Sequence, residues 1–491
     1  MTVLDAASAL YEQPMLIGDQ DTTGSKGTYA IINPSTEEVA GHAPEASIDD
    51  VRAAIAAANA AAPTWAATPV SERAALLRKL ADRLDQEKEE WYPFLGAEMG
   101  GTELGSAGKG VDVALIALRQ AAALAELDLN ERFAPRVAAG ELISGVALRK
   151  PLGVVAIWGA YNAAMVTVAS MAGPALVTGN TVILKPPPQC PLGILRLART
   201  AVAVGFPPGV INTVSGTDIE IGRELALNPG VHGLGFTGSP KVGVEIAKMA
   251  AERLKPLLLE LGGKGACIVM DDADLDKAFK TLGLTWVFHT GQICGAPTRA
   301  VVHEKVKDEL VRRLVELAGK LKIGPTSDPS TQVGPVINAA QRERVEGYIA
   351  SAVQEGATIA VGGKRPDIAP GFYAAPTLLV DCRSDMKAVR EEIFGPVISL
   401  ITVSSDDEAV AVANDSDYGL VNYVFSEDPV RAWNIANRLE SGNVNVNTWQ
   451  GGGNGIQEMP FGGRKFSGFG RKGGKHALEA FTEPVGITIA S

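Results

Sequence analysis

One cysteine in the sequence has the setting that a catalytic nucleophile needs. Cys294 lies in the segment Gly-Gln-Ile-Cys-Gly, with Gly291 three residues before it and Gly295 directly after it. Glycines at such positions let the backbone approach a bound molecule closely. The reference pKa of a thiol is about 8.5, so only a few per cent is thiolate at pH 7 unless the site lowers that value. A buried, inert thiol is the other interpretation, and this segment alone does not separate the two.

A glutamate upstream could supply the base that such a nucleophile needs. Glu260 interrupts the apolar run at residues 257–261. A buried carboxylate is costly unless it is paired or protonated. Burial raises its pKa toward neutrality, which suits a general base. A structural ion pair with a nearby Lys or Arg is the commoner outcome for a lone glutamate, so this alternative stays open.

Two further segments have the composition of a site for an anionic ligand. Residues 236–243 follow a predicted strand and open a helical pattern, so free N–H groups and the Ser239 hydroxyl could hold a phosphate. Lys185 ends another predicted strand and is followed by three prolines. Ligands of open parallel sheets bind at the carboxyl ends of strands. A Gly-Ser turn and a solvated lysine at a strand end are each weak signals alone.

The elements that must position these residues alternate between strands and helices. The first such region is predicted to contain strands at 153–157, 181–184, 210–214 and 231–236 and a helix at 191–204. A second region, within about 260–460, is predicted to contain strands at 266–270, 299–303 and 397–403 and a helix at 306–321. This alternation predicts an α/β fold with parallel sheets.

The remaining segments are predicted to flank these sheets. The first 130 residues are expected to be mainly helical, with Ser71 capping a helix that runs to about Trp91. Residues 132–149 combine β-branched and polar residues with two glycines, which predicts a hairpin. Residues 485–490 form a strand-like run with no evident local partner, so this strand is expected to pair elsewhere, for example in another subunit.

Composition limits the class of protein. The 491 residues correspond to roughly three domains. Lys and Arg total 45 and Asp and Glu total 56, and this net charge of −11 disfavours nucleic acid or an anionic membrane as a partner. No apolar run approaches the roughly 20 residues that cross a bilayer, and no secretory signal is visible, so a cytoplasmic location is expected. The four cysteines lack Cys-x-x-Cys spacing, and no metal site is expected.

Taken together, the motifs closely resemble those of the aldehyde dehydrogenase superfamily. The resemblance covers nearly the whole chain, from Ile32 to Glu483. The main motifs are, in order, Tyr161-Asn162, Gly173-Pro174-Ala175-Leu176, Lys185-Pro186, Gly205-Phe206-Pro207-Pro208-Gly209, Phe236-Thr237-Gly238-Ser239, Glu260-Leu261-Gly262-Gly263-Lys264, Gly291-Gln292-Ile293-Cys294, Glu392-Ile393-Phe394-Gly395-Pro396 and Pro460-Phe461-Gly462-Gly463. Any one of them could be accidental, but the whole ordered set could hardly be.

The resemblance implies oxidation of an aldehyde to the carboxylic acid with NAD or NADP, through a cysteine thiohemiacetal and thioester. Cys294 would attack the aldehyde, Asn162 would hold the oxyanion and Glu260 would activate the hydrolytic water. The implied cofactor-binding residues are Trp158, Tyr161, Lys185, Pro188, Gly238, Ser239, Gly243, Glu392 and Phe394. The implied substrate tunnel is lined by Ala163, Thr167, Ser170, Ile293 and Phe461.

The resemblance also implies the architecture and the assembly. A dinucleotide-binding domain would comprise residues 1–129 and 149–259, and a catalytic domain residues 260–465, both with mainly parallel sheets. Residues 130–148 and 482–491 would form a small β oligomerisation element. The expected partners are a small-molecule aldehyde and further copies of the chain, as a homodimer or homotetramer.

Two departures from the family pattern bear on specificity. Asn162 is followed by alanines where relatives have an aromatic residue and proline, and Ala163, Thr167 and Ser170 are all modest in size. These residues predict a wide tunnel that suits bulky or aromatic aldehydes. Pro188 stands where NAD-preferring relatives often carry a glutamate that binds the adenosine ribose. Because a repulsion against a 2′-phosphate is then missing, NADP is expected to be accepted or even preferred.

Three other features have no catalytic assignment. Residues 449–459 contain three consecutive glycines, so the mouth of the substrate site is expected to be mobile. Lys472 stands where relatives commonly have a glutamate, and the sequence gives no functional account of it. His289 is close to Cys294 in the sequence, but a structural or tunnel-lining part is expected for it rather than catalysis.

Two alternative functions stay open at this stage. A coenzyme A-acylating semialdehyde dehydrogenase would pass the thioester to coenzyme A, although such relatives generally lack the glutamate found at position 260. A non-catalytic structural relative would keep the fold without the chemistry. The presence of Cys294, Asn162, Glu260 and Glu392 together argues against that reading.

Overall fold

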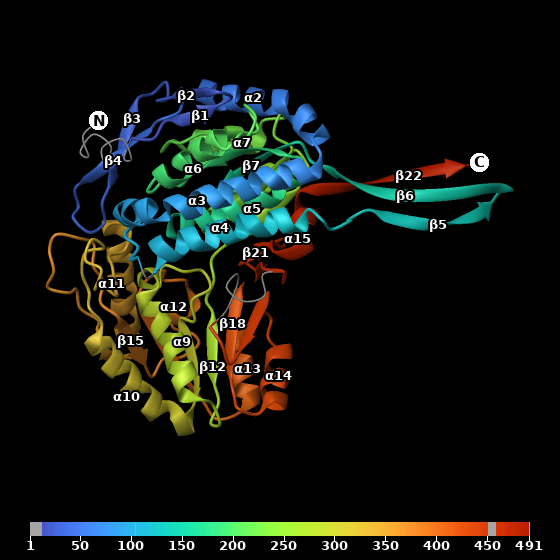
Figure 1. The fold of residues 1–491 in the computed structure, drawn as a ribbon. Coiled ribbons are helices and arrows are strands. Elements are labelled where there is room, and N and C mark those ends of the chain that lie inside the picture. The colour runs from blue at the N-terminus through green and yellow to red at the C-terminus, as the bar shows by residue number, and fades with distance from the viewer. Residues whose placement is uncertain (1–11, 104, 450–457, 491) are drawn as a thin grey trace.

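Two sheets, each covered by helices, form the body of the molecule, and a narrow three-stranded sheet projects from it (Figure 1). The structure is a computed structural model and describes residues 12–103, 105–449 and 458–490. The sheets are mainly parallel, so the α/β class predicted from the alternation of strands and helices is confirmed.

The first sheet has six strands in the order β21-β11-β10-β7-β8-β9. Its strands are β7 (Val154–Trp158), β8 (Thr181–Lys185), β9 (Ile211–Thr213), β10 (Gly233–Thr237), β11 (Leu257–Glu260) and β21 (Gly468–Phe469). All are parallel except β21, which runs antiparallel to β11. The register pairs Trp158 with Lys185 and Thr237 with Glu260. The carboxyl ends that carry the predicted site residues therefore meet at one edge of this sheet.

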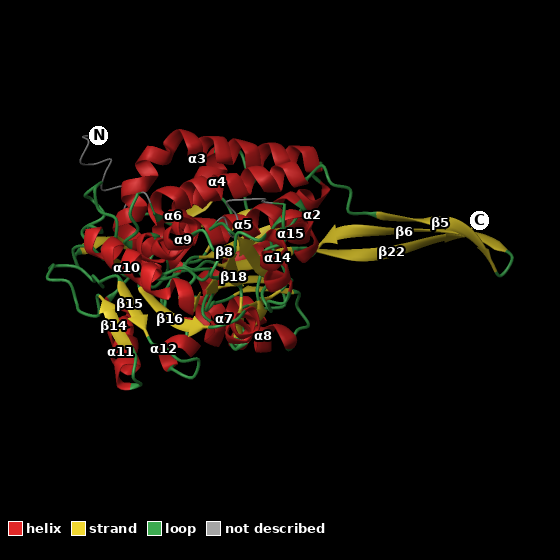
Figure 2. Ribbon diagram, turned by 90° about the horizontal axis from the view of Figure 1, so that it is seen from below, coloured by secondary structure: helices red, strands yellow, loops and turns green. Residues whose placement is uncertain are grey.

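Helices cover both faces of the first sheet (Figure 2). They are α2 (Ile48–Ala67), α3 (Val70–Met99), α4 (Ser106–Leu124), α5 (Ala164–Val177), α6 (Leu192–Ala203), α7 (Ile219–Leu227), α8 (Pro240–Ala251) and α15 (Gly474–Ala480). The predicted cap at Ser71 is wrong. Helix α3 begins one residue earlier, after Pro69, without a side-chain cap, because the fixed φ of proline (−54°) already sets the turn into the helix.

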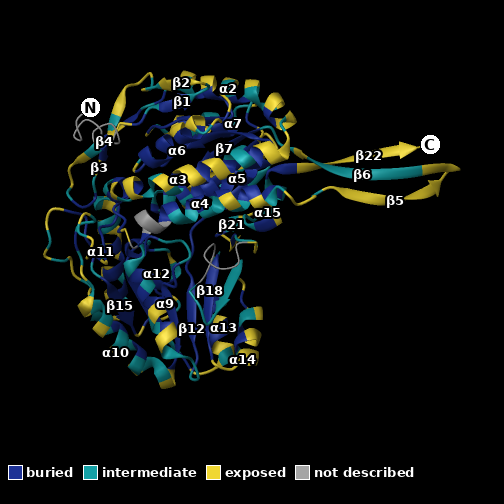
Figure 3. Ribbon diagram, in the orientation of Figure 1, coloured by how far each residue is buried: buried dark blue, intermediate teal, exposed yellow. Residues whose placement is uncertain are grey.

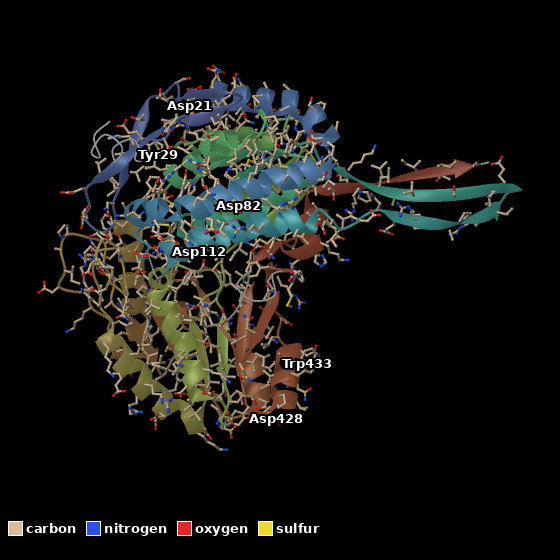
Figure 4. The ribbon with its side chains drawn as sticks, viewed as in Figure 1. Asp21, Tyr29, Asp82, Asp112, Asp428 and Trp433 are labelled. Carbon is tan, nitrogen blue, oxygen red and sulfur yellow. The ribbon has the colours of Figure 1, made fainter. Side chains whose placement is uncertain are left out.

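The second sheet has seven strands in the order β14-β15-β16-β13-β12-β18-β19. They are β12 (Ala266–Val269), β13 (Arg299–His303), β14 (Thr358–Val361), β15 (Thr377–Val380), β16 (Val397–Val403), β18 (Val421–Phe425) and β19 (Asn443–Val446), and only β14 is antiparallel to its neighbour. Its helices are α9 (Leu275–Val287), α10 (Glu304–Lys320), α11 (Ala339–Gln354), α12 (Lys387–Arg390), α13 (Asp406–Asn414) and α14 (Pro429–Asn437). Helix α14, marked by Trp433 and its capping residue Asp428, lies at the outer side of this half (Figure 4). A short pair, β17 (Tyr418–Gly419) and β20 (Arg464–Lys465), joins residues that are distant in sequence.

The first part of the chain differs from the mainly helical prediction. Residues 15–44 form two antiparallel pairs, β1 (Met15–Ile17) with β2 (Gln20–Thr22) and β3 (Thr28–Ile32) with β4 (Val39–Pro44). The Leu16 N–H donates to the Thr213 hydroxyl at 2.8 Å, which ties β1 to β9. These strands rest on contacts with the sheet, which local helical periodicity does not reveal.

The projecting sheet consists of β5 (Glu131–Ala138), β6 (Glu141–Pro151) and β22 (Thr482–Ala490). The hairpin predicted at residues 132–149 is therefore confirmed. The C-terminal strand is expected from the sequence to pair elsewhere, for example in another subunit, and β22 pairs with β6 of the same chain from Thr482–Pro151 to Ala490–Ile143, within the element that the resemblance implies for residues 130–148 and 482–491. Most of this sheet is exposed, whereas both large sheets are buried (Figure 3). Among the described helices, none is long and apolar enough to cross a membrane.

Candidate active site

Cys294 lies in a tight connection between α9 and β13. The 3₁₀ helix η2 (His289–Gly291) precedes it, and His289, Thr290 and Gly291 all have positive φ angles of 52°, 54° and 74°. A side chain at Gly291 would overlap the carbonyl of Gly395, so glycine is required for this close approach. The sequence predicts that glycines here let the backbone approach a bound molecule closely; in the structure, Gly291 packs against the protein's own backbone.

The cysteine loop is fixed from several sides. The Tyr423 hydroxyl donates to the Gly295 carbonyl at 2.7 Å. The side-chain oxygen of Gln292 accepts from the N–H of Ile337 at 3.0 Å. A Cβ at Gly263 would overlap the carbonyl oxygen of Cys294, so the loop after β11 lies directly against the cysteine backbone. The sulfur is thus presented by a rigid loop, which favours a defined geometry for attack.

Cys294 keeps a partly exposed surface, unlike Cys190, Cys267 and Cys382, which are buried. Burial is the largest cause that raises the pKa of the Cys294 thiol to about 12, and the charges of Glu260 and Glu392 contribute to this rise. Lys472 acts in the opposite direction and lowers that pKa. These couplings place the sulfur within electrostatic reach of two carboxylates and one ammonium group.

Glu260 is the last residue of β11 and is almost completely buried. Burial raises the pKa of its carboxyl to about 7, while Lys472 and Arg471 lower it. Its Oε2 lies 3.7 Å from the Lys472 Nζ, and its Oε1 has no hydrogen-bond partner among the described residues. The commoner alternative, a structural ion pair, therefore describes only one of the two carboxylate oxygens. Oε2 is paired with Lys472, whereas Oε1 has no partner among the described residues, and the pKa of the Glu260 carboxyl stays near neutrality.

Glu392 reaches the same region from the loop before β16. Its Oε1 accepts from the Gly263 N–H at 2.8 Å, and a side chain at Gly262 would overlap its carboxylate. Burial raises the pKa of Glu392 to about 7, and the Gly263 N–H, Lys264 and Arg344 lower it. Gly262 and Gly263 therefore bring the end of β11 against both Glu392 and the cysteine loop.

Asn162 lies in the 3₁₀ helix η1 (Tyr161–Ala163), directly after β7 and before α5, and is buried. Its neighbour Tyr161 packs edge-on against Phe394, with ring centroids 5.7 Å apart. The charge of Glu392 also raises the pKa of Tyr161, after the larger effect of burial. The segment with Asn162 is thus joined to the Glu392 loop, which is coupled in turn to Cys294.

The carboxyl edge of the first sheet has the features of a dinucleotide site. Lys185 is buried there and donates to the carbonyls of Pro186 and Gly216 at 3.3 and 3.4 Å. Burial lowers the pKa of Lys185 to about 8, and Glu45 raises it. The hydroxyl of Thr237 is buried and has no hydrogen-bond partner among the described residues. A buried cation, an orphaned hydroxyl and the N-terminus of α8 fit a group with phosphates and ribose hydroxyls.

The other predicted cofactor residues take different positions. Ser239 is exposed at the start of α8 and its hydroxyl accepts from the Val242 N–H at 3.5 Å. The Gly238 N–H is not free, because it donates to the Glu260 carbonyl at 3.0 Å. Gly243 lies inside α8, where a side chain would overlap Leu261, so it serves helix packing. The three others come from separate segments. Trp158 ends β7, Pro188 follows β8, and Phe394 lies in the loop before β16.

The predicted tunnel residues gather around the cysteine loop and α5. Ala163, Ser170, Ile293 and Phe461 keep partly exposed surface. Thr167 is buried, and its hydroxyl accepts from the Ala160 N–H and donates to the Ala164 carbonyl, both at 3.2 Å. It therefore braces the first turn of α5.

Sequence reasoning missed three residues of this region. Tyr423, which holds the Gly295 carbonyl, stacks on Trp449 with ring centroids 5.7 Å apart and an angle of 7° between the planes. Lys472, which had no functional account, pairs with Glu260. Trp449 preceded a glycine-rich run, but no local pattern linked Tyr423 or Lys472 to the cysteine.

Two other expectations concern residues near the site. His289 is buried, and burial lowers the pKa of its imidazole to about 3. A neutral, buried ring fits the structural part expected for it. The glycines of the segment expected to form a mobile mouth fall within 450–457, outside the described residues. In the described ranges, no three His, Cys, Asp or Glu side chains are grouped as a metal site would require.

Known proteins are similar to this chain in sequence along almost its whole length. Residues 22–486 match the sequence profile described as "Aldehyde dehydrogenase family". The mitochondrial aldehyde dehydrogenase of Leishmania tarentolae is 38% identical over 484 residues, which is 98% of this chain and 95% of that protein.

Solved structures are similar over almost the same length. The crystal structure of an NADP-dependent enzyme of E. coli superposes with a TM-score of 0.95 at 32% identity and covers 99% of both chains. The NAD-dependent aldehyde dehydrogenase from Sinorhizobium meliloti superposes with a TM-score of 0.93 at 34% identity, over 98% of this chain and 96% of that one.

Proposed function

Because this chain belongs to the aldehyde dehydrogenase family, we propose that it oxidises an aldehyde to the carboxylic acid with Cys294 as nucleophile, Asn162 as oxyanion donor and Glu260 as base. The enzyme is an NAD(P)-dependent aldehyde dehydrogenase. The observation that carries the proposal is that Gly263, three residues after the buried Glu260, lies directly against the Cys294 carbonyl and donates its N–H to the Glu392 carboxylate at 2.8 Å. Three separate segments of the chain meet there.

The first half of the reaction needs the thiol to lose its proton. Because the pKa of Cys294 is raised to about 12, a base has to accept that proton, and the Glu260 carboxylate is coupled to the thiol. The sulfur then forms a bond to the aldehyde carbon, and the carbonyl electrons move to the oxygen. The Asn162 side-chain amide and the Cys294 N–H hold that oxyanion. The oxidised nicotinamide ring, when bound, supplies the acceptor for the hydride.

The second half of the reaction releases the acid. The thioester on Cys294 is attacked by water, whose proton passes to the unpartnered Oε1 of Glu260. The carbon–sulfur bond breaks, and the sulfur leaves as thiolate. A carboxyl group with a pKa of about 7 is partly ionised near neutrality, so it can accept a proton and release it again.

The first sheet would hold the adenosine ribose and phosphate groups of the cofactor through Lys185 and Ser239, and Glu392, in the loop before β16, would hold the nicotinamide ribose. We expect NADP to be accepted and to match or exceed NAD in kcat/KM. Pro188 offers no carboxylate against a 2′-phosphate, and Lys185 offers a cation. Glu45, which acts on Lys185, accepts from the Thr217 N–H at 3.0 Å, so backbone donors already compensate part of its charge.

Steady-state kinetics with both cofactors at saturating aldehyde test this preference. A preference for NAD of about 100-fold, equivalent to about 2.7 kcal/mol, contradicts the argument. Pro188→Glu is the informative variant, because a carboxylate there should lower kcat/KM for NADP much more than for NAD. An equal loss with both cofactors indicates a disturbed strand end instead.

We also expect the preferred substrates to be bulky or aromatic aldehydes. Ala163 and Ser170 are small, and Phe461, Trp449 and Cys294 pack against the same apolar cluster. Aromatic walls favour apolar and aromatic ligands. A panel of aldehydes, followed by the absorbance of the reduced nicotinamide, tests the activity and its substrate class together. Turnover of acetaldehyde much faster than of any aromatic or long-chain aldehyde contradicts the wide tunnel, and no turnover of any aldehyde contradicts the proposed function.

Transfer of the thioester to coenzyme A is the second candidate reaction. Glu260 is buried and its Oε1 has no hydrogen-bond partner within the described ranges, which favours water as the acceptor. Product analysis with and without coenzyme A separates the two, because only hydrolysis gives the free acid at full rate without it.

We also propose the domain division and the assembly that the family resemblance implies. The first sheet with its helices forms the dinucleotide-binding domain, and the second sheet forms the catalytic domain. The projecting sheet exposes apolar side chains such as Phe133 (50%), Val137 (73%) and Ile489 (58%). Exposed apolar strands of this kind favour contact with another copy of the chain.

A further inference from the structure

Lys472 contacts the general base that the mechanism uses. We propose that Lys472 is a positioning residue, which holds the Glu260 carboxylate through Oε2 and so presents Oε1 to the water that hydrolyses the thioester. This inference rests on the proposed function. It assigns a part in the reaction to a residue whose type the sequence left unexplained.

The contact is built from buried and well-anchored groups. The Nζ of Lys472 lies 3.7 Å from the Glu260 Oε2, and the two side chains are only 14% and 3% exposed. The Lys472 N–H donates to the Phe461 carbonyl at 2.8 Å, and the Phe461 N–H donates to the Lys472 carbonyl at 2.6 Å. The ammonium group also lies 5.0 Å from the centre of the Phe461 ring. Backbone and side chain therefore fix the cation beside the carboxylate.

Neighbouring charges do not replace this contact. The Arg471 guanidinium donates to the carbonyls of Gly463 and Gly470 at 2.8 and 2.6 Å, so it is engaged with the backbone. Lys472 exerts the largest lowering effect on the pKa of Glu260, ahead of Arg471. Lys472 lowers the pKa of the Cys294 thiol as well, whereas Glu260 and Glu392 raise it.

The contact has two consequences for the chemistry. A cation on Oε2 keeps the carboxylate ionised at lower pH, so that it can accept a proton. It also stops the carboxylate from rotating, so Oε1 keeps one direction. Removing the cation raises the pKa values of both Glu260 and Cys294, because its charge stabilises the two anions. The acid limb of the pH profile of kcat and that of Cys294 alkylation should then both move to higher pH.

The test uses the full-length enzyme with Lys472→Met, which keeps an apolar side chain of similar length, and Lys472→Arg, which keeps the charge. Lys475→Met is the matched control, because Lys475 is exposed three residues further on. We expect Lys472→Met to move the acid limb of kcat upward by about one pH unit, so that kcat at pH 6 falls about tenfold. The aldehyde KM should change little, Lys472→Arg should restore most of the activity, and the control should match the wild type.

A second measurement follows the thiol without turnover. The rate of Cys294 alkylation by iodoacetamide, measured by mass spectrometry against pH, should shift in the same direction in Lys472→Met. Alkylation can be measured even if no aldehyde is oxidised, so a failure of the proposed function is distinguishable from a failure of this inference. An equal loss at every pH with unchanged limbs, which Lys472→Arg does not restore, indicates a merely structural residue and overturns the inference. A raised KM confined to aldehydes that carry a carboxylate, with unchanged limbs, indicates substrate binding and overturns it too.

Discussion

Cys294→Ser is expected to lower the rate of aldehyde oxidation by about 10⁴-fold or more. A serine hydroxyl is a much weaker nucleophile than a thiol, and the groups around this position disfavour an anion in any case. Already for the thiol, burial raises the pKa to about 12, and Glu260 and Glu392 add to the effect. The purified variant is assayed with its best aldehyde by the absorbance of the reduced nicotinamide.

Controls separate lost chemistry from lost structure. Cys382→Ser replaces a buried thiol that follows β15 and belongs to none of the segments assigned to the site, so its activity should stay close to that of the wild type. The Cys294→Ser variant should still bind the cofactor, because Lys185 and Ser239 are untouched. Retention of more than a tenth of the activity in Cys294→Ser contradicts the assignment of the nucleophile.

Local sequence patterns were sufficient for the parts of the fold that are built from local signals. Apolar runs ended by glycine or proline marked β8 and β10, and parallel strands necessarily bring their carboxyl ends to one edge. Lys185, which was predicted to end a strand, and Glu260, whose strand was not predicted, therefore lie at the same edge of the sheet. The segment around Cys294 predicted a backbone close to a bound molecule, and Gly291 instead makes a close contact with the Gly395 carbonyl.

The rest depends on contacts between segments that are distant along the chain. Within residues 15–44, β1 is held by a contact with β9 of the first sheet. Strand β22 pairs with β6, and the local pattern of neither strand predicts this pairing. Neither the sequence around Tyr423 nor the sequence around Gly295 predicts the hydrogen bond from the Tyr423 hydroxyl to the Gly295 carbonyl. The same is true of Lys472, whose importance appears only when its ammonium group is found beside Glu260.

The second large effect is expected for Glu260→Gln, which should slow thioester hydrolysis by about 10²- to 10⁴-fold. The amide has nearly the shape of the carboxylate but cannot accept a proton from water. In the wild type, the pKa of about 7 predicts that hydrolysis falls as the pH drops below that value, because the carboxyl group becomes protonated. This acid limb should be absent from the slow residual hydrolysis of the variant.

The same substitution separates the two halves of the reaction. Glu260 raises the pKa of the Cys294 thiol, so its neutral replacement should lower that pKa and speed alkylation of Cys294 at neutral pH. A first turnover should still form reduced nicotinamide, although more slowly because Glu260 is also the base proposed for the thiol, and the acyl-enzyme then accumulates and is detected by mass spectrometry as an adduct on Cys294. Glu98→Gln is the matched control, because Glu98 is also fully buried but accepts from the N–H groups of Leu192 and Gly193 at the start of α6. If Glu260→Gln releases acid at the wild-type rate without an adduct, water is activated by another group. The Lys472 contact would then serve the thiol alone.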